Sequence, residues 1–227
     1  TGYRLTLAPT SGATGRAEVV EVDAVVLATP APATAGLIRR LVPAAAAALD
    51  EIRHAGVCTV VLAYPAGSVA NRLTGTGFLV PPEEGRFVVG CTWLSAKWAY
   101  LASDRQVLIR CAVGRFGDER WTGMADDAIV AAVHQELAPT LGLSRLPERS
   151  VVQRWPDGLP QYTVGHADRV ERIDAALGAM PGLRVTGAAY RGVGLAGCVT
   201  NAVATARAVL DHLTPTTLAG TPAGTAP

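Results

Sequence analysis

Apolar residues near the start of the chain follow the spacing of strands and then of helices. Alternation of apolar and polar residues predicts two strands, and the continuous run Val25-Val26-Leu27-Ala28 predicts a third strand that is covered on both faces. Pro30 and Pro32 end that strand, because proline cannot donate to a ladder. Pro43 suits the first turn of a helix. The expected strands span residues 3–8, 18–22 and 25–28, and the expected helices span 34–41 and 43–51.

The middle of the chain changes to short apolar runs, some of them separated by glycine and proline clusters, which is typical of an antiparallel meander. Strands are expected over residues 57–64, 77–80, 86–93, 106–116 and 150–155. Between the last two, Ile129, Val133 and Leu137 recur at the spacing of one helix face and predict a helix over 125–138. A further helix is expected over 169–177, and Pro181-Gly182 breaks it.

A glycine motif stands near the end of the chain. Gly192-Val193-Gly194-Leu195-Ala196-Gly197 has the form G-x-G-x-x-G and lies between a strand-like run over 183–186 and a helix-like run over 198–212. Only 30 residues follow the motif, which leaves no room for the second strand and acidic residue of a first dinucleotide-binding unit. The motif is therefore either a chance match or a cofactor-contacting turn that closes a domain begun elsewhere.

These elements favour a split organisation of α/β plus α+β class. Residues 1–30 and the strand, turn and helix over 183–213 are expected to be parts of one nucleotide-binding type of domain. Residues 31–182 are expected to form an α+β insertion, and 214–227, rich in Thr, Ala, Gly and Pro, a disordered tail. The chain opens on Thr1 instead of an initiator methionine, so we expect a fragment whose N-terminal part is missing.

Composition removes several classes of function. The formal net charge of +1 gives no electrostatic case for binding nucleic acid, and no apolar run reaches the ~18 residues of a membrane span. The four cysteines show no C-x-x-C spacing, so neither a zinc site nor a disulfide framework is expected, and a reducing cytoplasm fits. No carboxylate pair, Ser-His-Asp order or metal-ligand spacing marks a catalytic centre.

Three segments together resemble a known family. Residues 23–30 (DAVVLATP), 155–166 (WPDGLPQYTVGH) and 181–198 are similar to the C-terminal half of the FAD-dependent protoporphyrinogen and coproporphyrinogen oxidases, which belong to the flavin amine oxidase superfamily. The resemblance covers nearly all of residues 1–212. It implies a two-domain flavin oxidase in which an antiparallel-sheet substrate domain is inserted into a split FAD-binding domain. The family's motif for the ADP half of FAD is N-terminal and is absent from this sequence.

The resemblance also implies a set of cofactor contacts. The backbone of Gly192, Val193, Gly194 and Leu195 matches the family turn that contacts the flavin end of FAD, and Trp155 matches an FAD-contact position. Where many relatives have Pro-Asp, this chain has Ala196-Gly197. A helix N-terminus following the turn would stabilise the anionic reduced flavin by roughly 0.3–2 kcal/mol.

Several residues keep two interpretations. Trp155 is either a flavin neighbour or an ordinary aromatic at a domain interface. Tyr162 either faces the substrate or makes a structural hydrogen bond, and His166 fits a turn or a cap better than a catalytic base. Arg191 pairs with a substrate propionate or a phosphate, or is a surface arginine. Other cations that an acidic tetrapyrrole could use, unranked by sequence, are Arg4, Arg39, Arg40, Arg110 and Arg115.

The family implies an oxidase of haem biosynthesis that converts a porphyrinogen, coproporphyrinogen III or else protoporphyrinogen IX, to the porphyrin with O₂ as acceptor. No catalytic side chain is identified, which a flavin reaction tolerates because the cofactor carries the redox chemistry. Two alternatives stay open. One is another flavin amine oxidase or a carotenoid desaturase, and the other is a non-catalytic remnant that lacks the N-terminal FAD motif.

Overall fold

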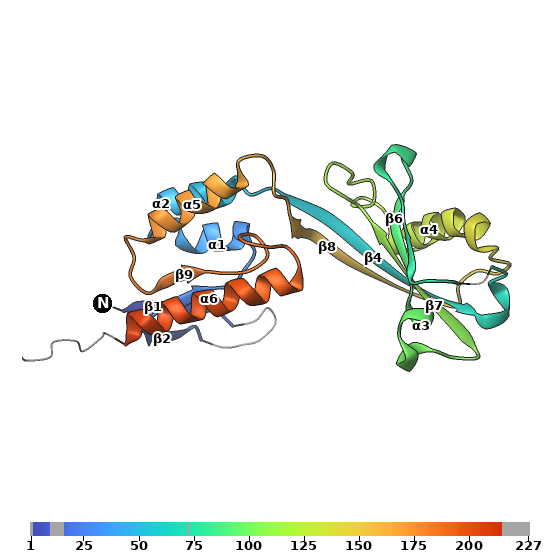
Figure 1. The fold of residues 1–227 in the computed structure, drawn as a ribbon, viewed down its shortest axis with the longest axis horizontal. Coiled ribbons are helices and arrows are strands. Elements are labelled where there is room, and N and C mark those ends of the chain that lie inside the picture. The colour runs from blue at the N-terminus through green and yellow to red at the C-terminus, as the bar shows by residue number, and fades with distance from the viewer. Residues whose placement is uncertain (1, 10–15, 72, 215–227) are drawn as a thin grey trace, which may run out of the picture. The chain divides into compact units, whose positions relative to one another are not determined.

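The computed structural model describes residues 2–9, 16–71 and 73–214 (Figure 1). The chain forms two compact units. Unit 1 comprises Thr1–Arg53 with Tyr162–Pro227, and unit 2 comprises His54–Gln161. The chain therefore leaves unit 1 once, builds unit 2 from one continuous segment, and returns.

The strands of unit 1 form two small sheets. β1 (Tyr3–Leu7) and β2 (Glu18–Val22) are antiparallel, with Tyr3 opposite Val22. β3 (Val25–Leu27) and β9 (Leu183–Val185) are parallel, with Val25 opposite Leu183. The continuous apolar run of β3 predicted a strand covered on both faces, and in this respect the prediction is wrong, because Val26 is 43% exposed.

The described part of unit 1 also holds the helices α1 (Ala31–Ile38), α2 (Pro43–Asp50), α5 (His166–Leu177) and α6 (Leu195–Leu213). The core of the unit is built by α1, α2 and α5 together with β3 and β9, and Ile38, Leu49 and Ile173 are its largest fully buried side chains. Figure 1 shows α2 and α5 on one side of β9 and α6 on the other.

Unit 2 is built on a five-stranded sheet in the order β5-β6-β7-β4-β8, in which every neighbouring pair is antiparallel. The predicted antiparallel pairing is confirmed, but only β5, β6 and β7 follow one another as a meander, because β4 lies between β7 and β8. Its strands are β4 (His54–Pro65), β5 (Gly77–Leu79), β6 (Val88–Trp93), β7 (Gln106–Val113) and β8 (Arg149–Pro160). The helical elements are α3 (Leu94–Lys97), α4 (Asp126–Leu141), and the 3₁₀ turns η1 (Ala66–Ser68), η2 (Pro82–Glu84) and η3 (Ala99–Leu101).

Helix α4 covers one face of this sheet. Ile129, Val133 and Leu137 are buried against β-strand residues such as Val60 and Ile109, which confirms the helix face predicted from their spacing. The helix ends at Gly142, whose φ of +61° suits a glycine at a helix C-terminus.

The units divide the chain at other residues than the expected boundaries. Residues 31–53 and 162–182 fall in unit 1 and not in the insertion, because the apolar faces of α1, α2 and α5 pack with β3 and β9. The last helix begins at Leu195, three residues before the expected start, so Gly197 lies inside it. The strand expected over 106–116 ends at Val113, because Gly114 takes a φ of +86°. The expected disordered tail lies, apart from Thr214, outside the described residues.

Within the described ranges, no helix combines the length and the apolar character that crossing a bilayer requires. Nor do residues 2–9, 16–71 and 73–214 hold a group of three His, Cys, Asp or Glu side chains able to bind a metal ion.

Candidate functional site

The glycine motif forms a tight turn between β9 and α6. Gly192 has a φ of +127°, and a Cβ atom placed on it would lie 2.9 Å from the Cα of Gly197. A Cβ on Gly197 would in turn lie 2.9 Å from the Cα of Gly192. The first and third glycines therefore pack backbone against backbone, and a side chain at either position would push the turn off the helix. Gly194 differs, because nothing lies within 4 Å of its Cβ position.

The N-terminus of α6 is open. Gly194 is its N-cap and provides no side-chain hydrogen bond, so the N–H groups of the first turn lack the partners that capping side chains give elsewhere. Val193 and Leu195 are 42% and 82% exposed. The helix dipole adds a partial positive charge at this end. An accessible, uncapped backbone with positive potential suits an anionic ligand atom, so these residues fit the flavin contact that the family resemblance implies.

Tyr162 fastens the turn from the side. Its hydroxyl donates to the Ala188 carbonyl at 2.8 Å and accepts from the Gly192 N–H at 2.8 Å. Its ring stacks on His166, with ring centroids 3.7 Å apart. This is the structural hydrogen bond that the sequence left as one of two interpretations. Because the side chain remains partly exposed, a contact with substrate stays a prediction.

His166 and Arg191 both have protein partners. His166 is buried at the start of α5, and its Nε2 lies 3.0 Å from the Tyr190 carbonyl. Since a carbonyl only accepts, Nε2 carries the hydrogen. The side chain of Tyr190, the residue that provides this carbonyl, is itself buried, and burial raises the pKa of its hydroxyl. Arg191 pairs with Asp174 of α5 at 2.6 Å, so its guanidinium already holds a carboxylate, and the predicted propionate or phosphate would have to share it.

Trp155 belongs to unit 2. It lies on β8 opposite Val57 of β4, next to an irregularity in the ladder, and its side chain is 51% exposed. The structure thus brings Tyr162, Arg191 and the glycine turn together within unit 1, and it places Trp155 on the sheet of unit 2.

The sheet of unit 2 has a second face, opposite the one that α4 covers. Arg110 of β7 lies there, in register with Val61 of β4 and Thr92 of β6, and Val61 is in register with Val151 of β8. Counting by twos along β4 from Val61 to Val57 places Trp155 on the same face. Arg110 and Ala112 are exposed, whereas their neighbours Ile109, Cys111 and Val113 are buried against α4.

Sequence could not rank Arg110 among the candidate cations, and the structure separates only some of them. Arg4 pairs with Glu21 and Arg39 with Asp50, each at 2.9 Å. Within the described ranges, no ion pair or side-chain hydrogen bond involves the guanidinium of Arg40, Arg110 or Arg115, and of these three Arg110 is the one in register with Val61 and Thr92 on this face. The signal was present in the alternation of β7, because three buried apolar residues at 109, 111 and 113 put position 110 on the other face.

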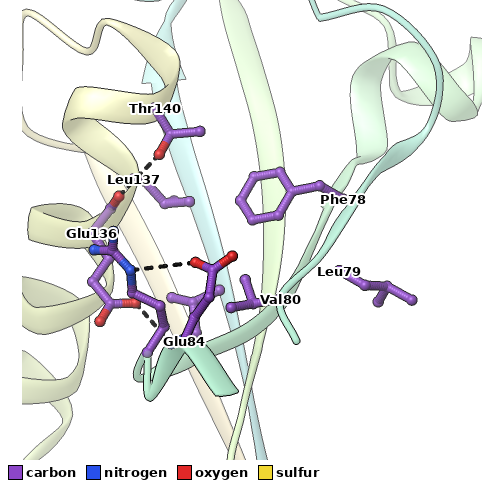
Figure 2. Close-up of a pocket in the computed structure, with 9 residues that line it drawn as sticks. Phe78, Leu79, Val80, Glu84, Glu136, Leu137 and Thr140 are labelled. Atoms are coloured by element: carbon purple, nitrogen blue, oxygen red, sulfur yellow. Dashed lines mark hydrogen bonds and ion pairs between the residues drawn. The ribbon is translucent and has the colours of Figure 1, made fainter. Parts of the chain in front are cut away.

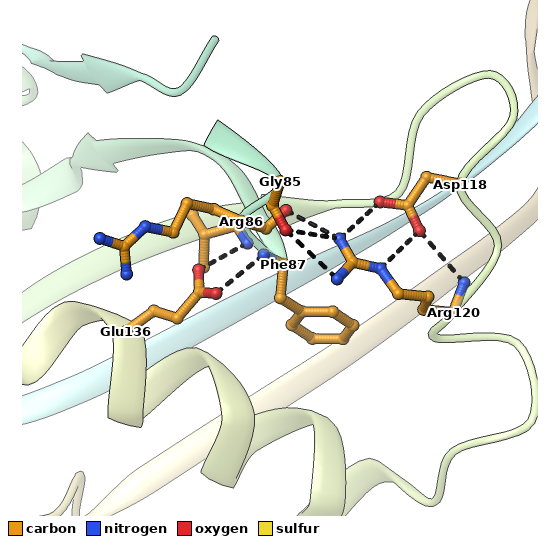
Figure 3. A network of polar contacts seen from close by, with 7 residues as sticks. Gly85, Arg86, Phe87, Asp118, Arg120 and Glu136 are labelled. Carbon is orange, nitrogen blue, oxygen red and sulfur yellow. Dashed lines mark hydrogen bonds and ion pairs between the residues drawn. The ribbon is translucent and has the colours of Figure 1, made fainter. Parts of the chain in front are cut away.

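A cavity of about 200 Å³ lies elsewhere, between the β5–β6 hairpin and α4 (Figure 2). Phe78, Leu137 and Thr140 line it together with charged Glu84, Arg86 and Glu136, but none of the predicted site residues does. Glu136 accepts the backbone N–H groups of Phe87 and Val88 at 2.8 and 3.0 Å, as Figure 3 shows, so its carboxylate serves to hold the start of β6 to α4.

Beside it, Arg120 ties three backbone and side-chain groups together (Figure 3). Its guanidinium binds Asp118 at 2.8 Å and donates to the carbonyls of Gly85 and Arg86. The hydrogen bond from Arg120 lowers the pKa of Asp118. This network joins the β5–β6 hairpin to the loop before α4, and we assign it to folding.

Comparison with known proteins bears on both units. The model of the family of flavin containing amine oxidoreductases matches residues 3–210. The chain is 34% identical over 196 residues to the coproporphyrinogen III oxidase of Bacillus subtilis (strain 168), covering 86% of this chain and 41% of that protein. It is 36% identical over 158 residues to the coproporphyrinogen III oxidase of Staphylococcus aureus, covering 69% of this chain and 34% of that protein.

A solved structure shares the fold. The crystal structure of an Exiguobacterium sp. 255-15 protein, which bears the provisional name protoporphyrinogen oxidase, matches with a TM-score of 0.73 at 29% identity. The match covers 93% of this chain and 44% of that one. The chain thus spans between a third and a half of the proteins it resembles. Since the family model covers most of its length, this mixed α/β chain belongs to the family of flavin containing amine oxidoreductases.

Proposed function

We propose that the protein containing this chain oxidises a porphyrinogen to a porphyrin with FAD as cofactor and O₂ as electron acceptor. Coproporphyrinogen III is the first candidate substrate, and the step would belong to haem biosynthesis in the cytoplasm. The observation that carries the proposal is the uncapped N-terminus of α6 behind the Gly192–Gly197 contact, in a chain that is 34% identical to a coproporphyrinogen III oxidase.

In this proposal the two units divide the work. Unit 1 is part of the FAD-binding domain, which the sequence builds from two separate segments, and unit 2 is the substrate-binding domain inserted between them. Support comes from the way His54–Gln161 forms a compact unit of its own on an antiparallel sheet.

FAD would be held at the flavin end by the backbone of Val193, Gly194 and Leu195, with Trp155 as a further contact. Bound FAD supplies the two-electron redox chemistry. The contribution of this chain is electrostatic. First-turn N–H groups of α6 and the helix dipole would stabilise negative charge on the reduced cofactor by roughly 0.3–2 kcal/mol, and these donors are already fixed in place before charge develops.

The substrate would lie on the open face of the unit 2 sheet. Val61 and Thr59 offer a partly buried surface for the tetrapyrrole macrocycle, and the Arg110 cation would pair with a propionate. On β4, Val61 lies opposite Arg110 and Val57 lies opposite Trp155. These two positions are four residues apart along the strand, which corresponds to about 13 Å. Charge pairing with Arg110 would favour a substrate that carries more carboxylates, as coproporphyrinogen does.

The test uses the complete gene product. We expect a yellow protein with flavin absorbance that makes coproporphyrinogen fluorescent in air and consumes O₂. Arg110→Met should raise KM for coproporphyrinogen about tenfold while leaving flavin content unchanged, and Arg145→Met, at an exposed arginine of the same unit, should leave KM unchanged. A colourless, well-folded protein would overturn the proposal and favour a non-catalytic remnant. A KM that is the same for Arg110→Met and wild type would remove Arg110 from the substrate site.

A further inference from the structure

Two side chains from one short segment hold the backbone that leads into the glycine turn. The Tyr162 hydroxyl binds the Ala188 carbonyl and the Gly192 N–H, and His166 Nε2 binds the Tyr190 carbonyl between them. Residues 188, 190 and 192 are therefore each hydrogen-bonded through a main-chain group. Such contacts fix the path of the loop independently of the side chains at these positions.

These hydrogen bonds are held rigidly because the side chains of Tyr162 and His166 pack against each other. The rings of Tyr162 and His166 are stacked with an interplanar angle of 13°, and His166 is only 9% exposed at the start of α5. Stacking leaves the phenol ring little freedom to swing, so its hydroxyl is held where both hydrogen bonds are made. The Arg191–Asp174 ion pair adds a second contact between the same loop and α5, beside that of His166.

Gly192 needs an external restraint. Only glycine adopts a φ of +127° without strain, and glycine also loses the most conformational freedom on folding. The peptide between Gly192 and Val193 sets the start of residues 193–195, whose N–H groups form the open end of α6. The hydrogen bond from the Gly192 N–H to Tyr162 fixes the preceding peptide, between Arg191 and Gly192, and so anchors the chain on the upstream side of Gly192.

We propose that Tyr162 is a positioning residue that sets the geometry of the glycine turn toward its ligand, with His166 as its support. The identity of that ligand as FAD rests on the proposed function above, whereas the ordering of the turn by the tyrosine does not. Tyr162 acts here through the Gly192 peptide and not by proton transfer.

Tyr162→Phe tests this idea because it keeps the ring and its stacking and removes only the hydroxyl. In the flavin-free protein, amide hydrogen exchange over residues 186–197 should speed up at least tenfold, while exchange in unit 2 stays as in wild type. In the holoprotein, the Kd for FAD should rise about tenfold and the flavin reduction potential should become more negative, because reduced flavin loses stabilisation. Tyr100→Phe, at an 80% exposed tyrosine, is the matched control and should change neither.

His166→Ala is the second variant, and it keeps the hypothesis falsifiable if Tyr162→Phe does not fold. It should loosen the same peptide by removing the stacking and the bond to Tyr190. Unchanged exchange and unchanged FAD affinity in a folded variant would overturn the positioning role. A wild-type protein that binds no FAD would overturn the proposed function. A wild-type protein that binds FAD no more tightly than both variants would overturn only the positioning role.

Discussion

Alanine substitution at the three glycines of the turn should separate folding from ligand contact. Gly192→Ala places a Cβ atom 2.9 Å from the Cα of Gly197 and forces a non-glycine residue to a φ of +127°. Gly197→Ala creates the same close contact from inside the helix, without the unfavourable φ. Gly194→Ala meets nothing within 4 Å and keeps a φ of −75°.

The magnitudes follow from these differences. A strained φ costs about 1–3 kcal/mol and an overpacked contact costs about 1–3 kcal/mol, so Gly192→Ala should lower the free energy of unfolding by about 2–6 kcal/mol. Gly197→Ala gains about 1 kcal/mol of helix propensity against its overpacking and should lie between zero and about 2 kcal/mol. At Gly194, the lost N-cap preference and the reduced freedom of the unfolded chain are each of about 1 kcal/mol or less and oppose each other.

Urea unfolding followed by circular dichroism would give these free energies. All four tryptophans, Trp93, Trp98, Trp121 and Trp155, lie in unit 2, so an unchanged native emission spectrum shows that a variant disturbs only unit 1. Gly194→Ala should keep wild-type stability but weaken FAD binding, since its methyl group would occupy the open side of the turn. Equal stability of Gly192→Ala and wild type, or a Gly194→Ala variant as unstable as Gly192→Ala, would refute this account of the turn.

Two further predictions concern polar contacts outside the turn. The hydrogen bond from Arg172 lowers the pKa of Glu51 to about 2, so the stability that this carboxylate contributes is complete above pH 4.5 and is lost as the pH falls toward 2. In Glu51→Gln the urea midpoint should therefore depend less on pH over that window. A midpoint that depends on pH as steeply as in wild type would contradict the assignment. Glu136→Gln leaves one carbonyl oxygen to serve two backbone N–H groups and should cost about 1–3 kcal/mol in urea unfolding. Glu171→Gln, at an exposed position of α5, is the control. The loss of stability in Glu136→Gln must exceed the loss in Glu171→Gln.

Local patterns predicted the elements better than the relations between them. The spaced residues Ile129, Val133 and Leu137 report which way their side chains face, and the structure agrees with them, whereas the apolar run of β3 predicted cover on both faces and Val26 is 43% exposed. The resemblance to flavin amine oxidases is likewise confirmed by the family model. These signals lie within a few residues of sequence, or in motifs, and need no knowledge of the fold.

The missing parts depend on contacts between distant residues. Tyr162 binds Gly192 across 30 positions, and no periodicity announces such a bond. The start of α6 was predicted too late because Ala196-Gly197 reads as turn material, whereas the contact of Gly197 with Gly192 places it in the helix. The unit boundaries were misplaced for a similar reason: α1, α2 and α5 carry apolar faces that fit any core, and only their packing with β9 assigns them to unit 1.

The pairing of His54 with Pro160 has a consequence for how the chain folds. These residues are close to the two ends of unit 2, so once that unit has formed, the strands on either side of its entrance hold Arg53 and Tyr162 near each other. The effective loop between the halves of unit 1 then shrinks from about 100 residues to about two, which lowers the entropic cost of closing it by roughly 3.5 kcal/mol. Early folding of unit 2 would thereby speed assembly of unit 1, whose two segments flank it in sequence.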